Sequence, residues 1–398
     1  MYKNIIKKLE PKSIAILGFG LEGKSTYHFI RRHLKEKSIT IIDKNDIRNE
    51  ELLKDNYLDF VIGEHYLDDL EKYDVIIKTP GISLKEIDTS KIENKITSQI
   101  ELLLEEYHEQ VIGITGTKGK STTTSLLYET LKAVGKDVYL LGNIGVPVLD
   151  EIEHYHKDSI LVVEMSSHQL EYIKVSPHIG VILNLFEDHL DHAGSVERYH
   201  NIKMHMFKYQ TKDDIAIYCK DNEVLYQKVL EGDYQTHLYP VTLNESTDAN
   251  TISIHGDYVS YQNELLYPVH GKRNLVGEHN LQNIMVILLI LKLHDVDISK
   301  VIDTINSFQP LEHRLECVGT FDGVTYYNDT IATIPAATMN GIEALKKVNT
   351  LIFGGMDRGI SYNDFITYLN HSKVEHLICM PRTGHHIGKE LVARKTEK

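Results

Sequence analysis

The chain has 398 residues, enough for two or three domains at roughly 150 residues per domain, which excludes a single small module. Its 43 Lys and Arg are outnumbered by 57 Asp and Glu, so the formal net charge is -14, and binding a nucleic-acid backbone is not expected as its main role. No apolar run approaches the ~20 residues that span a bilayer, and the N-terminus has no apolar signal core. We therefore expect a cytoplasmic protein without membrane insertion. Its three cysteines are far apart and predict neither disulfides nor a cysteine-based zinc site.

Short apolar segments alternate with helical stretches along most of the chain. Segments of this kind are typical of parallel strands that are buried on both faces, so the sequence predicts an α/β fold. The expected strands are 13–17, 38–42, 75–77, 111–114, 160–163 and 181–183. Residues 209–277 differ, because 251–254 and 258–261 alternate polar and apolar side chains. We expect an antiparallel elaboration over that stretch.

Two breaks divide this pattern. The first falls near residues 91–97, before a helix expected at 99–106, and the second near 307–310, where Ser-Phe-Gln-Pro ends a helical pattern. The predicted domains are therefore 1–95, 96–307 and 308–398.

A glycine motif follows the first strand. It reads Gly18-Phe-Gly20-Leu-Glu-Gly23, and the second strand ends at Asp43. Glycines at these spacings allow a tight turn and let a diphosphate approach the N–H groups of a helix N-terminus, while a carboxylate can accept from a ribose hydroxyl. We interpret the motif as a nucleotide or nucleotide-sugar site. Simple packing of the strand against the helix stays open as the alternative.

A second glycine loop follows the strand at 111–114. It reads Gly116-Thr-Lys-Gly119-Lys120-Ser121-Thr122 and opens into a helix expected at 124–132. Successive N–H groups of such a loop form an anion nest, Lys120 supplies charge at the β and γ phosphates, and the Ser121 hydroxyl can ligate Mg²⁺. Ile114 stands where the strict GxxxxGK[ST] pattern has its first glycine. A purely structural turn has no use for lysine and serine here, so the sequence predicts nucleoside triphosphate binding.

Oxygen and imidazole donors follow the next two strands. One cluster is Glu164-Met-Ser-Ser-His-Gln169, and the other contains Asn184 and Glu187-Asp-His189. A carboxylate at the carboxyl end of a buried strand, beside a phosphate loop, is placed to hold Mg²⁺. Capping of a helix is the alternative for Glu164.

Taken in chain order, these motifs resemble the Mur ligases of peptidoglycan synthesis. The further matching segments are Gly142-Asn143-Ile-Gly145, 199–203, Gly277-Glu-His-Asn280 with Asn283, His313-Arg314-Leu-Glu316 and Asn328-Asp329. The first glycine motif and Thr79-Pro-Gly-Ile82 look most like the member that adds D-glutamate to UDP-N-acetylmuramoyl-L-alanine. The resemblance implies an ATP-dependent acid–amino acid ligase with an acyl-phosphate intermediate. It also implies three domains: a Rossmann-like N-terminal domain, a P-loop-type ATPase centre and a Rossmann-like C-terminal domain.

The resemblance also implies roles for individual residues. ATP is expected at Gly116, Thr117, Lys118, Gly119, Lys120, Ser121, Thr122, Asn283, Arg314 and Asp329. The UDP-substrate is expected at Gly20, Leu21, Asp43, Thr79, Asn143, Gln169 and His189. Two Mg²⁺ ions are expected at Ser121, Glu164, His189 and an N-carboxylated Lys203, and the expected catalytic residues are Lys120, His189 and Lys203. Without the resemblance, Lys203 is interpreted as an exposed helix residue, and Arg314 could be a surface ion-pair partner.

The C-terminal part departs from the family pattern. After Asp329 the chain has Thr-Ile-Ala-Thr333-Ile-Pro, where D-glutamate ligases commonly have a lysine, so a positive charge is missing unless Arg358 replaces it. Thr333 and Arg358 are the candidates for binding glutamate. The variant also resembles relatives that add L-glutamate. Relatives continue for several tens of residues past the point that matches Lys398, so the C-terminal domain is expected to be incomplete.

Other functions stay open at this stage. The ligation could use L-glutamate or another amino acid, or a folate in a folylpolyglutamate synthetase, although the first glycine motif has no role with a folate. A non-catalytic nucleotide-binding regulator and an NAD dehydrogenase are the alternatives from other classes. We expect a monomer.

Overall fold

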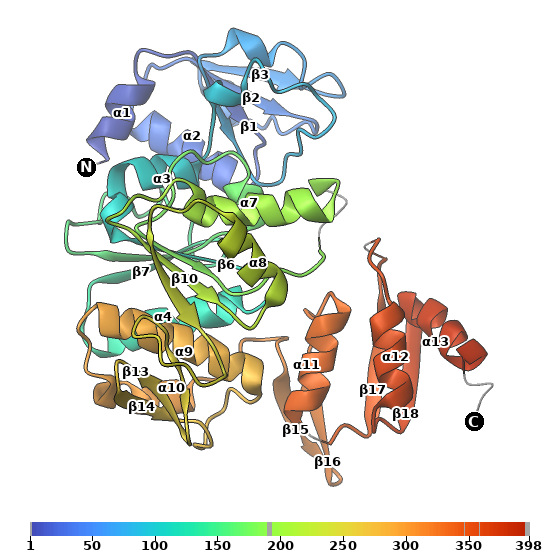
Figure 1. The fold of residues 1–398 in the computed structure, drawn as a ribbon. Helices are drawn as coiled ribbons and strands as arrows, with labels where there is room; N and C mark the ends of the chain where they lie inside the picture. The colour runs from blue at the N-terminus through green and yellow to red at the C-terminus, as the bar shows by residue number, and fades with distance from the viewer. Residues whose placement is uncertain (1, 189–192, 346, 358, 395–398) are drawn as a thin grey trace.

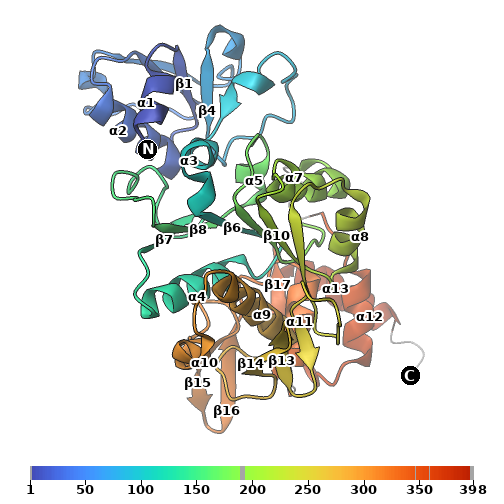
Figure 2. The same cartoon turned by 60° about the vertical axis from the view of Figure 1, so that its left-hand side comes forward.

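The computed structural model describes residues 2–188, 193–345, 347–357 and 359–394. Within these residues the strands form two larger parallel sheets and three small sheets (Figure 1). The N-terminal sheet lies on one side of the central sheet, and the antiparallel strands labelled β13 and β14 lie on the other, in both views (Figures 1 and 2). The predicted α/β class is confirmed.

The N-terminal sheet has the strand order β3-β2-β1-β4-β5, with all neighbours parallel. Its strands are β1 (Ile14–Leu17), β2 (Ile39–Asp43), β3 (Leu58–Ile62), β4 (Val75–Lys78) and β5 (Ile96–Thr97). The helices and short 3-10 turns among them are α1 (Lys3–Leu9), α2 (Leu21–His33), η1 (Leu52–Lys54), η2 (Leu70–Lys72) and η3 (Glu93–Lys95). The central strand β1 is buried throughout, as expected of a parallel strand covered on both faces. The apolar pattern does not predict β3, an edge strand interrupted by the exposed Asp59.

The central sheet has the order β11-β10-β9-β6-β8-β7 and is also parallel. Its strands are β6 (Val111–Thr115), β7 (Val138–Gly142), β8 (Ile160–Glu164), β9 (Ile179–Ile182), β10 (Ile215–Cys219) and β11 (His237–Val241). Ile112 of β6 is aligned with Val162 on one side and Ile179 on the other. Because β6 lies between β8 and β9, the residues that follow these three strands meet at one edge of the sheet.

Helices surround this sheet and include the most apolar one of the described chain. They are α3 (Gln99–Tyr107), η4 (His108–Gln110), α4 (Lys120–Ala133), α5 (Ser167–Leu170), α7 (Val196–Lys208), α8 (Glu223–Glu231), α9 (Glu278–Leu293), η5 (Ile298–Lys300) and α10 (Ile302–Ser307). Residues 284–291 of α9 are all buried, so this helix is apolar on every side and forms core. None of the described helices is long and apolar enough to cross a membrane.

The antiparallel elaboration expected over 209–277 is smaller than predicted. Antiparallel pairing is found in β12 (Ser253–His255), β13 (Tyr258–Tyr261) and β14 (Glu264–Pro268). The preceding β10 and β11 instead extend the parallel sheet, and the expectation is wrong for them. The reason is visible in β10, whose Ile-Ala-Ile-Tyr-Cys run is largely buried, as a strand inside a parallel sheet requires.

The C-terminal part contains a hairpin and a two-stranded parallel sheet. Its elements are β15 (Glu316–Phe321), β16 (Val324–Asn328), α11 (Pro335–Leu345), β17 (Thr350–Gly355), α12 (Asn363–His371), β18 (His376–Arg382) and α13 (Thr383–Arg394). A small apolar cluster joins α12 to α13 through Phe365, Leu369 and Ile387. The domain boundaries 1–95, 96–307 and 308–398 remain a prediction, and β5 lies just past the first of them.

Candidate functional site

The glycine loop connects β6 to α4 at the carboxyl edge of the central sheet. Gly119 has φ 87°, a left-handed conformation that glycine adopts without strain. A Cβ atom there would lie only 2.9 Å from Oδ1 of Asn283, so the loop passes directly against helix α9. Asn283, predicted from sequence for the ATP site, is buried at this contact, with 6% exposure.

Asn184, the residue predicted as part of the second donor cluster, fixes the shape of this loop. The Lys118 N–H donates to Asn184 Oδ1 at 2.8 Å, and Asn184 Nδ2 donates back to the Lys118 carbonyl at 3.0 Å. The Thr117 N–H also donates to the Asn184 carbonyl at 3.0 Å. The loop is thus held in shape by protein contacts. The position of Asn184 directly after a buried strand is the sequence signal for this role.

Lys120 begins helix α4 and folds over the loop. Its Nζ donates to the carbonyl oxygens of Gly116 at 2.9 Å and Thr117 at 3.1 Å. Burial lowers the pKa of Lys120, the nearby Glu164 carboxylate opposes that shift, and the charge of Arg314 adds to it. A half-buried lysine beside the loop is suited to an anionic ligand, which would restore its preference for the charged form.

Glu164 is the last residue of β8, and its two carboxylate oxygens differ in their contacts. Its Oε1 accepts from Asn143 Nδ2 at 2.7 Å, whereas its buried Oε2 has none among the described residues. A buried carboxylate oxygen in this state is costly, and a cation would satisfy it. Glu164 and the Ser121 hydroxyl are oxygen donors of the kind that Mg²⁺ prefers, so these residues fit the ion. The alternative of a helix cap fails, because Ser166 caps α5.

Lys203 is buried in α7, with 1% exposure, and this corrects its interpretation as an exposed helix residue. Its Nζ lies 3.5 Å from Thr115 Oγ1 and 4.8 Å from the centre of the Tyr199 ring. Burial, and next the charge of Lys120, hold the pKa of Lys203 well below its ordinary value. Both effects disfavour the protonated amine, and the unprotonated form is the one that can act as a nucleophile.

Two residues from the C-terminal part contact the glycine loop. Arg314 Nη2 donates to Ser121 Oγ at 3.0 Å, and Lys118 Nζ donates to Thr333 Oγ1 at 2.8 Å. Arg314 therefore lies at the loop, as the ATP-site prediction expects. Asp329 contacts the residue after Arg314, because its Oδ1 accepts from the Leu315 N–H at 2.9 Å. Burial raises the pKa of Asp329.

In the N-terminal sheet, the predicted nucleotide residues gather at the ends of β1, β2 and β4. Asp43 Oδ2 accepts from the Phe19 N–H at 2.8 Å, and Thr79 Oγ1 donates to the Leu17 carbonyl at 3.0 Å. Both side chains thus shape the glycine turn itself. Beside them, Gly20 precedes α2 with open space around it, and Leu21 is 72% exposed, which leaves an apolar side chain available for a ligand.

Gln169 and Asn143 are predicted for the same substrate but sit on the central sheet. Gln169 lies in α5, and its Nε2 donates to Glu22 Oε1 of α2 at 2.8 Å. This bond links a helix beside the central sheet to a helix of the N-terminal sheet. Asn143 braces Glu164, as described above. His189 and Arg358 lie outside the described residues.

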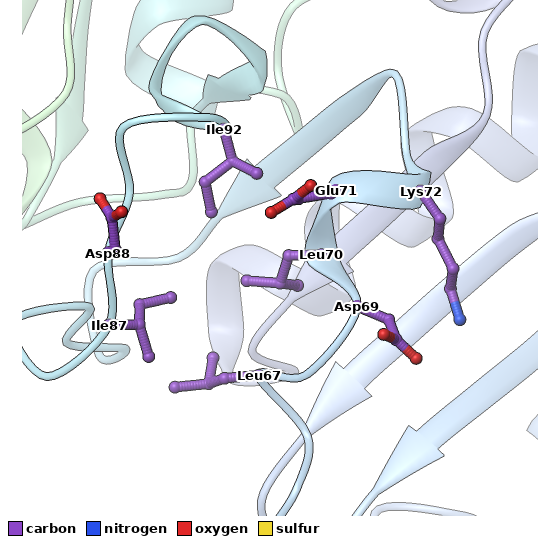
Figure 3. Close-up of a pocket in the computed structure, with 8 residues that line it drawn as sticks. All are labelled: Leu67, Asp69, Leu70, Glu71, Lys72, Ile87, Asp88 and Ile92. Carbon is purple, nitrogen blue, oxygen red and sulfur yellow. The ribbon is translucent and has the colours of Figure 1, made fainter.

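A pocket of about 450 Å³ opens elsewhere, beside η2 in the N-terminal part (Figure 3). It is lined by Leu67, Asp69, Leu70, Glu71, Lys72, Ile87, Asp88 and Ile92. None of the predicted site residues is among them. Three carboxylates against one lysine make this pocket unsuitable for a diphosphate.

Comparison with known proteins gives the family. The Mur ligase middle domain matches residues 114–291, which contain the glycine loop, Glu164 and Lys203. The chain is 33% identical over 389 residues to the UDP-N-acetylmuramoylalanine–D-glutamate ligase of Clostridium kluyveri, covering 94% of this chain and 82% of that protein. The enzyme of the same name from Clostridioides difficile is 31% identical, over 95% of this chain and 85% of its own length.

Solved structures agree on the fold. The MurF ligase of Thermotoga maritima in complex with ADP aligns with a TM-score of 0.58 and 19% identity, covering 94% of this chain and 82% of that one. The UDP-N-acetylmuramate-alanine ligase MurC of the same organism aligns with a TM-score of 0.56 and 18% identity, covering 97% and 89% of the two chains. With the extent of the sequence match and the shared architecture, the chain belongs to the Mur ligase family.

Proposed function

We propose that this protein joins D-glutamate to UDP-N-acetylmuramoyl-L-alanine in an ATP-dependent amide ligation of peptidoglycan precursor synthesis. The observation that carries the proposal is the meeting of the glycine loop, Glu164 and the buried Lys203 at one edge of the central sheet. Relatives that bear the name of this ligase are about a third identical over nearly the whole chain, which supports the choice of substrates.

ATP would occupy the glycine loop, with Lys118, Lys120 and Ser121 near its phosphates. The ADP complex of the related MurF supports a nucleotide in this fold. Asn283 borders the loop from α9, and Arg314 reaches it from the C-terminal part. Asp329 would complete the nucleotide site beyond Arg314.

The chemistry needs activation, because a carboxylate is a poor electrophile. An oxygen of the substrate carboxylate attacks the γ-phosphorus of ATP, the bond to the β-phosphate oxygen breaks, and ADP leaves. The amine of glutamate then attacks the carbonyl carbon of the acyl phosphate, phosphate departs, and the nitrogen loses a proton to leave an amide. The protein's work is alignment and charge neutralisation, which the loop N–H groups, Lys120 and Arg314 are placed to do.

Two Mg²⁺ ions would be held near the phosphates. Ser121 and Glu164 would hold one of them, which is supported by Glu164 Oε2 having no hydrogen-bond partner among the described residues. His189 and Lys203 would hold the other. Bound magnesium would supply positive charge against the phosphate oxygens.

Lys203 would serve as a carbamate. A neutral amine adds to the carbon of CO₂ and loses a proton, which gives an N-carboxylate with two oxygen donors. The lowered pKa of Lys203 favours this reaction, because only the unprotonated amine attacks. The modification would convert a lysine, which repels a metal ion when protonated, into an anionic ligand.

The UDP-substrate would extend from the N-terminal sheet to the central sheet. Gly20, Leu21, Asp43 and Thr79 would line the uridine diphosphate end. Asn143, Gln169 and His189 would face the muramoyl end. Thr333 and Arg358 would bind the incoming glutamate. We place the reaction in the cytoplasm, where ATP and nucleotide-activated sugars are available, and expect a monomer that uses no nucleic acid and no membrane segment.

One experiment tests the proposal and the stereochemistry together. The purified protein is incubated with ATP, Mg²⁺, UDP-N-acetylmuramoyl-L-alanine and either D- or L-glutamate, and the products are weighed by mass spectrometry. We expect a product heavier by one glutamate residue with the D-isomer. If product forms with L-glutamate alone, the proposed amino-acid substrate is wrong and L-glutamate takes its place. If ATP binds but neither isomer gives product, the protein is a nucleotide-binding regulator and not a ligase.

A further inference from the structure

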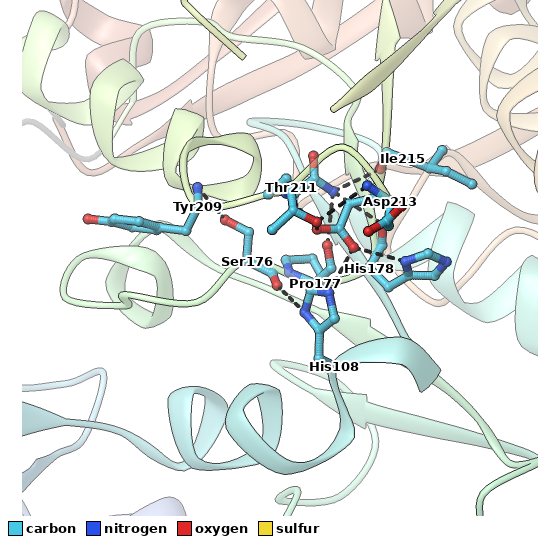
Figure 4. Close-up of polar contacts among 10 residues, drawn as sticks. His108, Ser176, Pro177, His178, Tyr209, Thr211, Asp213 and Ile215 are labelled. Atoms are coloured by element: carbon cyan, nitrogen blue, oxygen red, sulfur yellow. Dashed lines mark hydrogen bonds and ion pairs between the residues drawn. The ribbon is translucent and has the colours of Figure 1, made fainter. Parts of the chain in front are cut away.

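Three metal-ligating side chains meet at the opposite edge of the central sheet from the glycine loop. His108 lies in η4 just before β6, His178 directly precedes β9, and Asp214 directly precedes β10. These strands are neighbours in the order β10-β9-β6, so the three residues stand at adjacent strand beginnings. Figure 4 shows the two imidazole rings converging below the turn that contains Thr211.

The two imidazoles face the same carboxylate oxygen. His108 Nε2 lies 2.7 Å and His178 Nδ1 2.9 Å from Asp214 Oδ1. The three potential ligand atoms all lie within 4.8 Å of one another. Two nitrogens and one oxygen are therefore close enough together to share one ion.

The contacts behind these atoms fix how they are oriented. His108 Nδ1 lies 2.9 Å from the Ser176 carbonyl, which can only accept, so Nδ1 carries the hydrogen. In a neutral ring, Nε2 then directs a lone pair at Asp214 Oδ1, and two acceptors at 2.7 Å require a cation. Asp214 Oδ2 is held by the Thr211 N–H at 2.7 Å and its hydroxyl at 3.0 Å. Outer hydrogen bonds of this kind are typical of residues that ligate a metal.

We propose that His108 Nε2, His178 Nδ1 and Asp214 Oδ1 bind one Zn²⁺-class ion. Two imidazoles and a carboxylate suit zinc, whereas Mg²⁺ prefers an all-oxygen set. The Asp214 side chain is 1% exposed, but those of His108 and His178 are 29% and 30% exposed, which gives the ion a path of entry and room for a water as fourth ligand. Because the site lies away from the loop edge, it would hold three strand beginnings together and act on stability.

A proton on His108 Nε2 would satisfy the same contacts without a metal ion. Titration with zinc distinguishes a protonated histidine from a metal site. The full chain is stripped with a chelator and titrated with Zn²⁺, the bound ions are counted by native mass spectrometry, and Tm is recorded. His108→Ala removes one ligand. His270→Ala is the matched control, because His270 is an 81% exposed histidine that pairs with Asp257 at 3.8 Å and is not one of the three proposed ligands.

We expect the wild type and His270→Ala to bind one more Zn²⁺ per chain than His108→Ala, and saturating zinc to raise their Tm by roughly 5 °C more. Equal zinc counts in all three proteins would overturn the proposal. If His108→Ala does not fold, the visible absorption spectrum of Co²⁺ added to the wild type tests the site instead. Intense visible bands of tetrahedral Co²⁺ support the site, and only weak octahedral bands overturn it.

Discussion

The guanidinium of Arg314 donates to the hydroxyl of Ser121 at 3.0 Å, although the two residues are 193 positions apart in the sequence. Ser121 lies in the first turn of α4, behind the glycine loop, and Arg314 lies just before β15. A contact of this kind forms only when the C-terminal part stands against the central sheet. In the proposed function, a residue from a distant part of the chain would therefore complete the nucleotide site.

Replacing this guanidinium should weaken use of ATP. We expect Arg314→Lys to lower kcat/KM for ATP by roughly 10- to 100-fold, because an ammonium cannot reproduce the planar donor geometry of arginine. Steady-state kinetics at varied ATP measures the effect. Arg48→Lys is the control, since Arg48 pairs with Asp46 on the surface. An unchanged kcat/KM in Arg314→Lys would exclude Arg314 from the ATP site.

A methyl group in the glycine loop should weaken nucleotide binding. Gly119→Ala puts a Cβ 2.9 Å from Asn283 Oδ1 in a left-handed backbone, so we expect ATP affinity to fall at least ~10-fold and the free energy of unfolding by ~1–3 kcal/mol. Gly135→Ala is a matched control, because Gly135 also has positive φ, at 75°, but nothing within 4 Å of its added Cβ. Calorimetric titration with ATP should separate the two variants. Equal affinities would show that the clash at Asn283 is relieved without cost.

Glu164 should matter through its charge. Glu164→Gln keeps the shape and the bond from Asn143 but removes the anion, so we expect turnover to fall by roughly 100-fold and the Mg²⁺ concentration for half-maximal activity to rise. The measurement is activity against Mg²⁺ concentration. Glu223→Gln, an exposed carboxylate in the first turn of α8, is the control. A Glu164→Gln variant with an unshifted Mg²⁺ profile would contradict metal binding by this residue.

An unmodified Lys203 should destabilise the folded protein. The unfolded chain, with an ordinary lysine pKa, binds a proton that the folded state with its lowered pKa does not. The contribution of Lys203 to stability is therefore greatest above the ordinary lysine pKa and falls as the pH drops below it. In metal-free, CO₂-depleted buffer at pH 7 we expect Lys203→Met to raise the free energy of unfolding by about 1–4 kcal/mol and to flatten its rise toward alkaline pH. Urea unfolding at pH 7 and 9 measures both, and a destabilised Met variant would contradict a buried, unmodified amine.

The same residue should be needed for turnover as a carboxylate. We expect Lys203→Ala to lose nearly all activity and short-chain carboxylic acids to restore part of it, because an added carboxylate can occupy the space that the carbamate leaves. Phosphate release is measured with and without added acetate or propionate. Normal activity in Lys203→Ala would refute the carbamate role.

Much of the fold and of the loop can be predicted from the sequence, because buried parallel strands and the glycine turn are local patterns. The burial of Lys203 is also encoded locally, since Tyr199, Lys203, Met206 and Phe207 follow helical spacing along one face of α7. A charged residue on that face is easily taken for an exposed one.

Contacts over long distances cannot be predicted in this way. His108 and Asp214 are separated by 106 positions, and no local pattern marks them as neighbours. They become neighbours only through the order of the strands, in which β6, β9 and β10 are adjacent although other strands intervene in the sequence.

In the proposed reaction, the γ-phosphoryl group of ATP is transferred to the carboxylate of the UDP-sugar substrate. Labelling that carboxylate with ¹⁸O and analysing the released phosphate by mass spectrometry tests it most directly. We expect one ¹⁸O atom in each phosphate formed, because the oxygen that attacks the phosphorus leaves with it. Phosphate without the label, formed while amide product accumulates, would contradict the acyl-phosphate route.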